Sequence, residues 1–218
     1  MERFAVITGD IIESTKLKAA ERKKLLQNLD LFFKKFSSET ENELNLKIPF
    51  EVFRGDSFQG MLETPEESLK ICILLRSYLK SQYYSGQDLD ARIAIGIGKV
   101  SFKSAKLSES DGEAFHNSGR LLDVLKKQPQ KIGIQSPWKT VNDEINIGLI
   151  LLEGIIGKWT SLQADVIYLK LLGMTEMTIS STLKIAQPAV NQRAKAASWT
   201  AVEAFIKRYK ELIITKIK

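Results

Sequence analysis

Two aspartates, each directly after a glycine, are the residues of this chain best suited to carry chemistry. Asp10 follows Gly9 in VITGDIIEST, and Asp56 follows Gly55 in VFRGDSFQG. Each position is typical of a strand end, and we expect the two aspartates to be adjacent in one sheet. Two close carboxylates are costly unless a cation lies between them, and hard divalent cations favour such oxygen ligands. The pair therefore predicts a site for Mg²⁺ or Mn²⁺.

The segment after Asp10 is expected to open the first helix. Free backbone N–H groups at a helix N-terminus favour the binding of phosphate. We therefore expect Ile11, Ser14 and Thr15 to contact the phosphates of a nucleotide bound with the metal. His116, the one histidine of the chain, could contact a phosphate, but a lone histidine on a helix is more often structural.

These residues are set within alternating strand and helix patterns in the first 137 residues. The resulting β-α-β-β-α-β order, followed by one more α-β unit, predicts a ferredoxin-like α+β domain with an antiparallel sheet and helices on one face. The predicted strands cover 3–9, the two halves of 48–63, 90–100 and 131–135, and the predicted helices cover 16–36, 64–84 and 115–127.

Four motifs in this half resemble those of the class III nucleotide cyclases, whose catalytic domain has this palm-like fold. They contain Asp10, Asp56, the strand ARIAIGIG and the helix from Gly112 to Arg120. The resemblance implies metal binding by the two aspartates, phosphate binding by Arg120 and a composite site between two subunits of a homodimer. Three functional residues of the family are replaced in this chain. His116 stands in place of the catalytic asparagine, Val52 in place of the purine-selecting lysine, and Glu109 in place of the aspartate that partners this lysine. We therefore assign no residue to catalysis.

The strand signal stops after Ser136-Pro137, and we expect a second, all-α domain over 138–218. A helix ends at Gly173, a residue suited to a left-handed helix C-terminus, and Thr175 can cap the next, short helix. A turn leads to a third helix beginning at Gln187-Pro188. The predicted inward side chains are Leu162, Val166, Leu169, Leu172, Ile179, Leu183, Val190, and Ala194 or Ala197.

The segment from Gln163 to Arg193 resembles the helix-turn-helix modules of the sigma-factor region-4 and LuxR class. Ala186 departs from the serine or threonine cap that is usual there. The third helix is expected to enter the major groove with Gln187, Asn191, Gln192 and Lys195 toward the bases, since Asn and Gln can pair with adenine and Lys can reach guanine or phosphate. Contacts to phosphates are expected from Arg193, Lys207 and Arg208.

Charge and composition agree with a soluble protein that binds nucleic acid. The formal net charge is +6, of which +4 lies in the 81 residues from Trp138 onward. Neither a signal peptide nor an apolar run of membrane-spanning length is present. The single cysteine, Cys72, lies in an apolar stretch and is expected in the core. We therefore expect a cytoplasmic protein with no membrane partner.

Together the patterns predict a transcriptional regulator that binds double-stranded DNA and whose first domain senses a nucleotide or mediates dimerisation. The alternative is a metal-dependent nucleotide cyclase or nucleotidyl transferase, which would require Asp10 and Asp56 for turnover. In a third interpretation, both domains are protein-interaction modules. The layout of a cyclase-like domain followed by a helix-turn-helix also resembles that of the SatD family of bacterial proteins.

Overall fold

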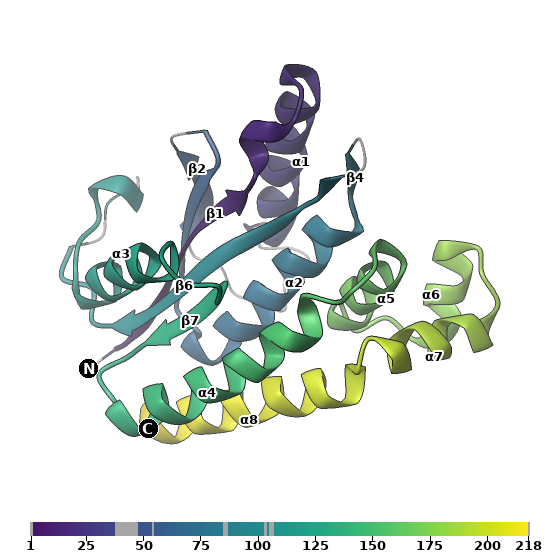
Figure 1. The fold of residues 1–218 in the computed structure, drawn as a ribbon. Helices are drawn as coiled ribbons and strands as arrows, with labels where there is room; N and C mark the ends of the chain where they lie inside the picture. Colours follow the sequence, from purple (N-terminus) through teal and green to yellow (C-terminus); the bar gives the residue numbers. More distant parts are fainter. Residues whose placement is uncertain are drawn as a thin grey trace.

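The computed structural model describes residues 2–37, 48–53, 55–84, 87–102, 104 and 107–217. These residues form a mixed fold with a five-stranded sheet and eight α-helices (Figure 1). None of the described helices is long and apolar enough to cross a membrane.

The first strand, β1, occupies the middle of the sheet. The spatial order is β2-β3-β1-β6-β7, with β1 antiparallel to both neighbours and β7 parallel to β6. A separate two-stranded ribbon pairs β4 with β5. The strand bounds are Phe4–Ile12 for β1, Ile48–Phe53 for β2, Ser57–Leu62 for β3, Tyr83–Tyr84 for β4, Gln87–Asp88 for β5, Asp90–Gly98 for β6 and Ile132–Gln135 for β7.

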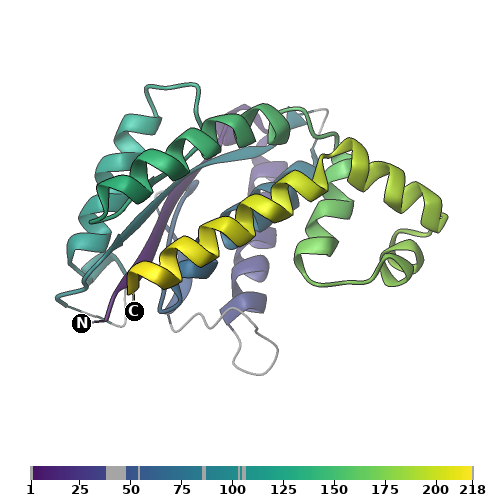
Figure 2. The same ribbon diagram turned by 90° about the horizontal axis from the view of Figure 1, so that it is seen from below.

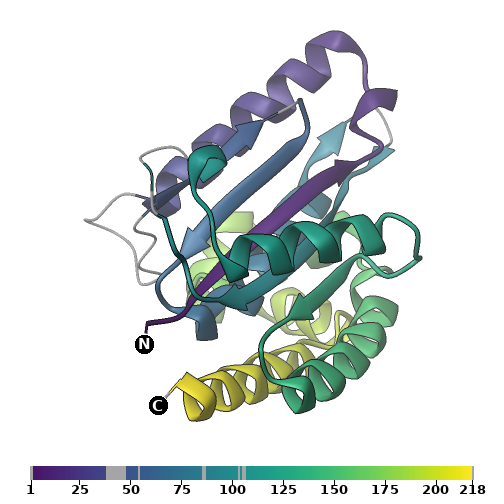
Figure 3. The ribbon, with the colours of Figure 1, turned by 90° about the vertical axis from the view of Figure 1, so that its left-hand side faces the viewer.

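Helices cover both faces of the sheet and β7 is parallel to β6, so the expectation of an antiparallel sheet with helices on one face is wrong for the last α-β unit. Helices α1 (Ala19–Ser37) and α2 (Ser68–Ser81) pack on one face against a large apolar core. Helix α3 (Glu113–Leu125) lies on the other face, toward the viewer in Figure 3. Strand side chains alternate between faces, so Ile7 joins the α1–α2 side and Val6 joins the smaller cluster with Phe115 of α3.

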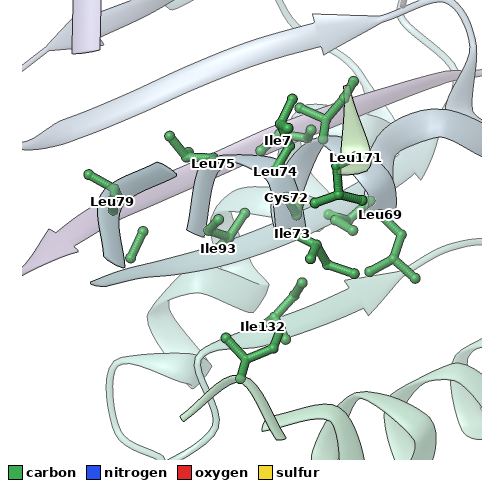
Figure 4. Close-up of a cluster of buried hydrophobic side chains, with 14 of the residues drawn as sticks. Ile7, Leu69, Cys72, Ile73, Leu74, Leu75, Leu79, Ile93, Ile132 and Leu171 are labelled. Atoms are coloured by element: carbon green, nitrogen blue, oxygen red, sulfur yellow. The ribbon is translucent and has the colours of Figure 1, made fainter. Parts of the chain in front are cut away.

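Helix α2 is buried almost all round, which accounts for its continuous apolar sequence. Strands β1, β6 and β7 cover one side of it with Ile7, Ile93 and Ile132, and Leu171 of the next helical layer covers the other (Figure 4). A helix that is apolar on every side is stable only when both sides are covered. Cys72 lies in this core with no exposed surface, as expected from the sequence, and burial raises the pKa of its thiol.

Five helices follow β7 and form the second half of the chain. Helices α4 and α8 lie across the underside of the molecule, whereas α6 and α7 extend away from the sheet (Figures 1 and 2). The helix bounds are Lys139–Ile156 for α4, Ser161–Leu171 for α5, Glu176–Leu183 for α6, Gln187–Ala196 for α7 and Trp199–Ile217 for α8.

The hydrophobic core crosses the boundary proposed between residues 137 and 138. Apolar residues of α4, α5 and α8 belong to the same cluster as the sheet and α2. The buried hydroxyl of Tyr209 in α8 lies 2.6 Å from the Ser68 hydroxyl at the start of α2. Arg76 of α2 donates hydrogen bonds of 2.8 Å to both carboxylate oxygens of Glu153 in α4. The two halves of the chain are therefore joined by packing as well as by the polypeptide.

Several predicted boundaries differ from those observed. Strand β1 runs on to Ile12, so Asp10 lies within the strand rather than at its end. Helix α1 begins only at Ala19, after a short 3-10 turn at Ser14–Lys16. Helix α2 ends at Ser81, because the chain turns there into the β4–β5 ribbon.

Candidate nucleic-acid interface and carboxylate pair

Local capping explains where α5, α6 and α7 begin and end. The Thr160 hydroxyl accepts a hydrogen bond from the backbone N–H of Gln163, whose side chain accepts one in return from the Thr160 N–H. Such a capping box satisfies two N–H groups that a helix start leaves free. Thr175 caps α6 in the predicted way, accepting from the Thr178 N–H at 3.2 Å. Gly173 adopts a φ of 79°, which glycine tolerates best.

The turn between α6 and α7 is tight and held by a side chain. Lys184 ends α6 in the left-handed conformation, with a φ of 53°. The Ser180 hydroxyl donates a 2.6 Å hydrogen bond to the carbonyl of Ile185 in the turn. Helix α7 then begins at Gln187 with Pro188 in its first turn, as predicted, and the capping position, Ala186, offers no side-chain acceptor.

A small core fixes the three helices relative to one another. It is separate from the main core and brings together Val166, Leu169, Ile179, Val190 and Ala194. The expectation that Leu162 also faces inward is wrong, because this side chain is 53% exposed at the first turn of α5. The predicted inward positions of Leu183 and Leu172 are partly buried against this cluster.

Helix α7 presents a polar face to solvent on the side opposite Val190 and Ala194. The exposed residues on this helix include four predicted to read bases, namely Gln187, Asn191, Gln192 and Lys195. Arg193 is half-buried and lies near Asp165 of α5. Burial raises the pKa of the Asp165 carboxyl, and a hydrogen bond with Ser81 and the charge of Arg193 partly offset this rise. The structure therefore brings the four predicted base-reading residues onto one element and turns Arg193 toward α5.

A hollow of about 510 Å³ borders this polar face. Asn191 and Lys195 line it from α7, and Lys170 and Glu176 line it from α5 and α6. Lys170 pairs with Glu176 at 3.3 Å and lies 5.8 Å from the ring centre of Trp199. This lysine could not be predicted from the polar spacing of α7, because it lies on α5.

Lys207 and Arg208 lie on α8 rather than beside the polar face of α7. A helix rises about 1.5 Å per residue, so Lys207 is about 12 Å along the axis from Trp199 at the start of α8. Both side chains are exposed, and Arg208 Nε donates a 3.0 Å hydrogen bond to Glu144 of α4. The two predicted phosphate contacts thus have different surroundings, since Arg208 faces α4 whereas Lys207 lines a second hollow together with Lys170 and Trp199.

The two aspartates lie close together, as expected, with Asp10 within β1 and Asp56 in the turn directly before β3. Asp10 of β1 is paired in register with Ser57 of β3, directly after Asp56. The backbone N–H of Ile11 donates a 3.1 Å hydrogen bond to the carbonyl of Asp56. The chain thus brings the two residues together although 46 positions separate them in the sequence.

Each aspartate carboxylate already has a partner within the protein. Arg92 of β6 donates from Nη1 to both oxygens of Asp10, at 3.1 and 3.3 Å. Ser14 donates its hydroxyl proton to Asp56 at 2.6 Å. Arg92, which was not among the predicted site residues, lies directly opposite Asp10 in the β1–β6 pairing. A guanidinium therefore offsets the charge of Asp10, as a metal ion would.

The predicted phosphate cradle does not have the expected geometry. The backbone N–H of Ile11 is used by Asp56, and its side chain is buried in the core. Ser14 is buried, whereas Thr15 is exposed. These residues form the end of a strand and a 3-10 turn, because α1 begins later than predicted. They do not form a helix N-terminus.

Helix α3 covers the sheet face that carries Asp10. Thr8, two positions before Asp10 and so on the same face, lies 2.9 Å from the hydroxyl of Ser118 in α3. Arg120 of α3 is exposed, and no hydrogen bond or ion pair involves its side chain in the described part of the chain. His116 is also exposed and lies 3.1 Å from Asp111. Within one chain, the structure therefore does not join Arg120 to the aspartates.

Two other positions implied by the cyclase resemblance, Val52 and Glu109, have contacts within the chain. Val52 of β2 packs against the main core. It has no polar end that could contact a base, unlike the purine-selecting lysine of the family. Glu109 accepts a 2.9 Å hydrogen bond from Ser104. Across the described residues, no group of three His, Cys, Asp or Glu side chains is placed to hold a metal ion.

Comparison with known proteins gives one family. The profile of the SatD family matches residues 4–211, and therefore spans both the sheet and the helices that follow it. No curated protein matches the chain.

Proposed function

The chain belongs to the SatD family, and we propose that it is a DNA-binding transcriptional regulator. In this proposal α5, α6 and α7 form a helix-turn-helix with α7 as the recognition helix. The observation that carries the proposal is the exposed polar face of α7, which lies opposite the buried Val190 and Ala194.

The chemistry of this face suits the edges of base pairs. Asn191 and Gln192 can each make two hydrogen bonds to adenine, and Lys195 can reach guanine or a phosphate. A short helix, a tight turn and a second helix place such side chains in the major groove. The small core that joins Val166, Ile179 and Val190 supports this interpretation, because it holds α7 in a fixed orientation.

For the first half of the chain we propose a ferredoxin-like domain that senses a nucleotide or mediates dimerisation. The β-α-β-β-α-β order and the strand order β2-β3-β1-β6 support that fold. The pairing of Arg92 with Asp10 counts against metal-dependent catalysis, since a metal ion would have to compete with the guanidinium for the carboxylate.

The second candidate function is that of a metal-dependent nucleotide cyclase or nucleotidyl transferase. The hydrogen bond between Ile11 and Asp56 favours it, because it keeps the two aspartates on adjacent backbones. Phosphoryl transfer assisted by metal ions needs both the ions and groups that stabilise the transferred phosphate. The two carboxylates could supply ligands for the ions, but they cannot stabilise the negative charge of the phosphate.

The test is a titration of labelled duplex DNA with the full chain, followed by fluorescence anisotropy. We expect binding that weakens by at least about 10-fold between about 50 mM and about 200 mM salt, because contacts to phosphates release counterions. The Lys195→Ala variant should bind more weakly than the wild type, and Lys139→Ala, which changes an exposed lysine at the start of α4, should not. Absence of binding at low salt to a pool of random duplexes would overturn the proposal.

A further inference from the structure

One face of α4 exposes three large apolar side chains. Ile147, Ile150 and Leu151 are 63%, 58% and 70% exposed. Their spacing of three and four residues places them on one side of the helix, and the opposite side, with Ile145 and Leu149, packs into the core. In the view from below, α4 lies on the surface of the molecule (Figure 2).

The cluster differs from the other exposed apolar residues of the chain. Leu31 of α1 and Met177 of α6 are equally exposed, but each lies on a different helix. Single exposed apolar residues are normal on protein surfaces, whereas contiguous patches mark interaction sites. A helix that is apolar on two opposite sides, as α4 is, is expected to have a partner on each.

A hollow of about 360 Å³ lies beside the cluster, toward the C-terminal end of α4. Ile150, Glu153 and Gly154 line it from the helix, and residues 128–130 line it from the loop before β7. A Cβ atom added to Gly154 would have no neighbour within 4 Å. This end of the face can therefore receive a protruding side chain.

Charge is distributed unequally along the same face. Asp143 and Glu144 are exposed near its N-terminal end. Lys158 is exposed just past its C-terminal end. Lys139 pairs with Asp143 and Arg208 pairs with Glu144, so the N-terminal end of the face carries charges of both signs. The C-terminal end carries one lysine, and the part between the two ends is apolar.

We propose that this face of α4 binds the same face of a second copy of the chain, with the two helices antiparallel. A two-fold axis between Ile150 and Leu151 would place Ile147 of each copy against Gly154 of the other. The same axis would place Asp143 of each copy near Lys158 of the other. Every contact of a two-fold interface occurs twice. One protruding side chain, one hollow and one pair of opposite charges on each copy are therefore enough to form a symmetric contact.

This surface is independent of the proposed function, because it contains none of the residues assigned to DNA or to a nucleotide. It also differs from the composite site implied by the cyclase resemblance, which would involve Asp10, Asp56 and Arg120. A contact between two helices is at the small end of specific protein interfaces. We therefore expect a dimer with a dissociation constant on the order of micromolar.

The first test is sedimentation of the full chain over a range of concentrations. We expect a monomer–dimer equilibrium, and in Leu151→Asp a dissociation constant raised by at least about 100-fold, because the dimer would bury two carboxylates without partners. The matched control is Leu31→Asp, which places the same charge at an equally exposed position on α1 and should leave the equilibrium unchanged. Thermal unfolding checks that both variants are folded. A wild-type chain that stays monomeric at about 100 µM, or a dimer that survives Leu151→Asp, would overturn the proposal.

The second test measures the register by disulfide formation. Chains with Ile147→Cys are mixed with chains with Gly154→Cys under mild oxidation, and Cys72 does not interfere because it is buried. We expect the mixed disulfide to form faster than either homodisulfide, since residues 147 and 147′ would lie about 10 Å apart along the axis. Equal rates for all three products, or no product, would contradict the antiparallel arrangement.

Discussion

The Asp90 carboxylate accepts hydrogen bonds from Nε and Nη2 of Arg76, both at 2.8 Å. Arg76 has no exposed surface, and it also binds Glu153 of α4 with two further hydrogen bonds. Lys131, just before β7, reaches Asp90 at 3.0 Å. One buried guanidinium therefore joins α2, β6 and α4, and fixes the helix whose outer face we propose as the dimer contact.

The first prediction is that Asp90→Asn lowers the free energy of unfolding by about 3–5 kcal/mol, because Glu153 alone would then have to offset the positive charges of Arg76 and Lys131. Denaturation by urea measures it. The control is Asp123→Asn, which changes an exposed carboxylate 3.9 Å from Lys126 and should alter stability by less than about 0.5 kcal/mol. Equal stability of Asp90→Asn and the wild type would show that Arg76 is satisfied without Asp90.

The same carboxylate predicts a pH dependence of stability. Burial alone would raise the pKa of Asp90, but Arg76, Lys131 and Lys80 hold it well below the ordinary value. The stabilisation is therefore complete above the pKa of the unfolded chain, about 3.9, and is lost as the pH falls further toward the folded pKa. Urea denaturation between about pH 6 and pH 3 should show a shallower decline for Asp90→Asn than for the wild type.

The second prediction distinguishes the residues proposed to recognise the base sequence from those proposed to bind any DNA duplex through its phosphates. Replacing Asn191 and Gln192 by alanine should lower the preference for the best duplex over a random one by about 10-fold or more, because each paired contact is worth about 1–3 kcal/mol. Replacing Lys207 and Arg208 should weaken all duplexes alike and reduce the salt slope by about one for each phosphate that is no longer neutralised. Competition experiments at constant salt distinguish the two results. If the alanine changes at 191 and 192 left the preference intact, α7 would not be the reading element.

The third prediction concerns the aspartate pair. We expect weak binding of Mn²⁺ in the presence of ATP or GTP, because such ions usually take part of their ligands from phosphate oxygens. Calorimetry should show a metal-dependent heat that is lost in Asp56→Asn and retained in Asp123→Asn. Identical traces for the wild type and Asp56→Asn would reduce the pair to structural residues. A metal-dependent heat without turnover would fit a sensor better than an enzyme.

The parts of the structure that depend on local sequence were predicted well. The starts of α6 and α7 and the glycine turn before α6 were correct, because caps and glycines act within a few residues. The buried positions of Val190 and Ala194 followed from helical spacing. The adjacency of Asp10 and Asp56 could also be predicted, since it needs only the order of the strands.

The partners of these residues could not be predicted. Arg92 meets Asp10 across 82 positions, and only the register of β1 against β6 makes them neighbours. The failure of the phosphate cradle has a similar origin, because β1 continues through Ile12 where pairing with β6 stabilises it. The burial of Arg76 likewise depends on α4 covering it, and nothing near Arg76 in the sequence indicates that contact.

The last prediction concerns the N-terminus of α7, where no side chain caps the helix. Ala186 has the extended backbone typical of a cap, with φ −67° and ψ 144°, but offers no side-chain acceptor. Pro188 has no N–H, so a hydroxyl at position 186 would accept from Ala189. Ala186→Ser should stabilise α7 by about 0.5–1 kcal/mol, which would slow hydrogen exchange at the buried amides of α7 about 2- to 5-fold if they exchange by local opening. Ala196→Ser, an exposed change at the other end of α7, cannot cap and should not slow exchange. The backbone N–H of Ala189 already donates to the Ala186 carbonyl at 2.9 Å. Faster exchange in Ala186→Ser would mean that this N–H cannot turn toward the new hydroxyl.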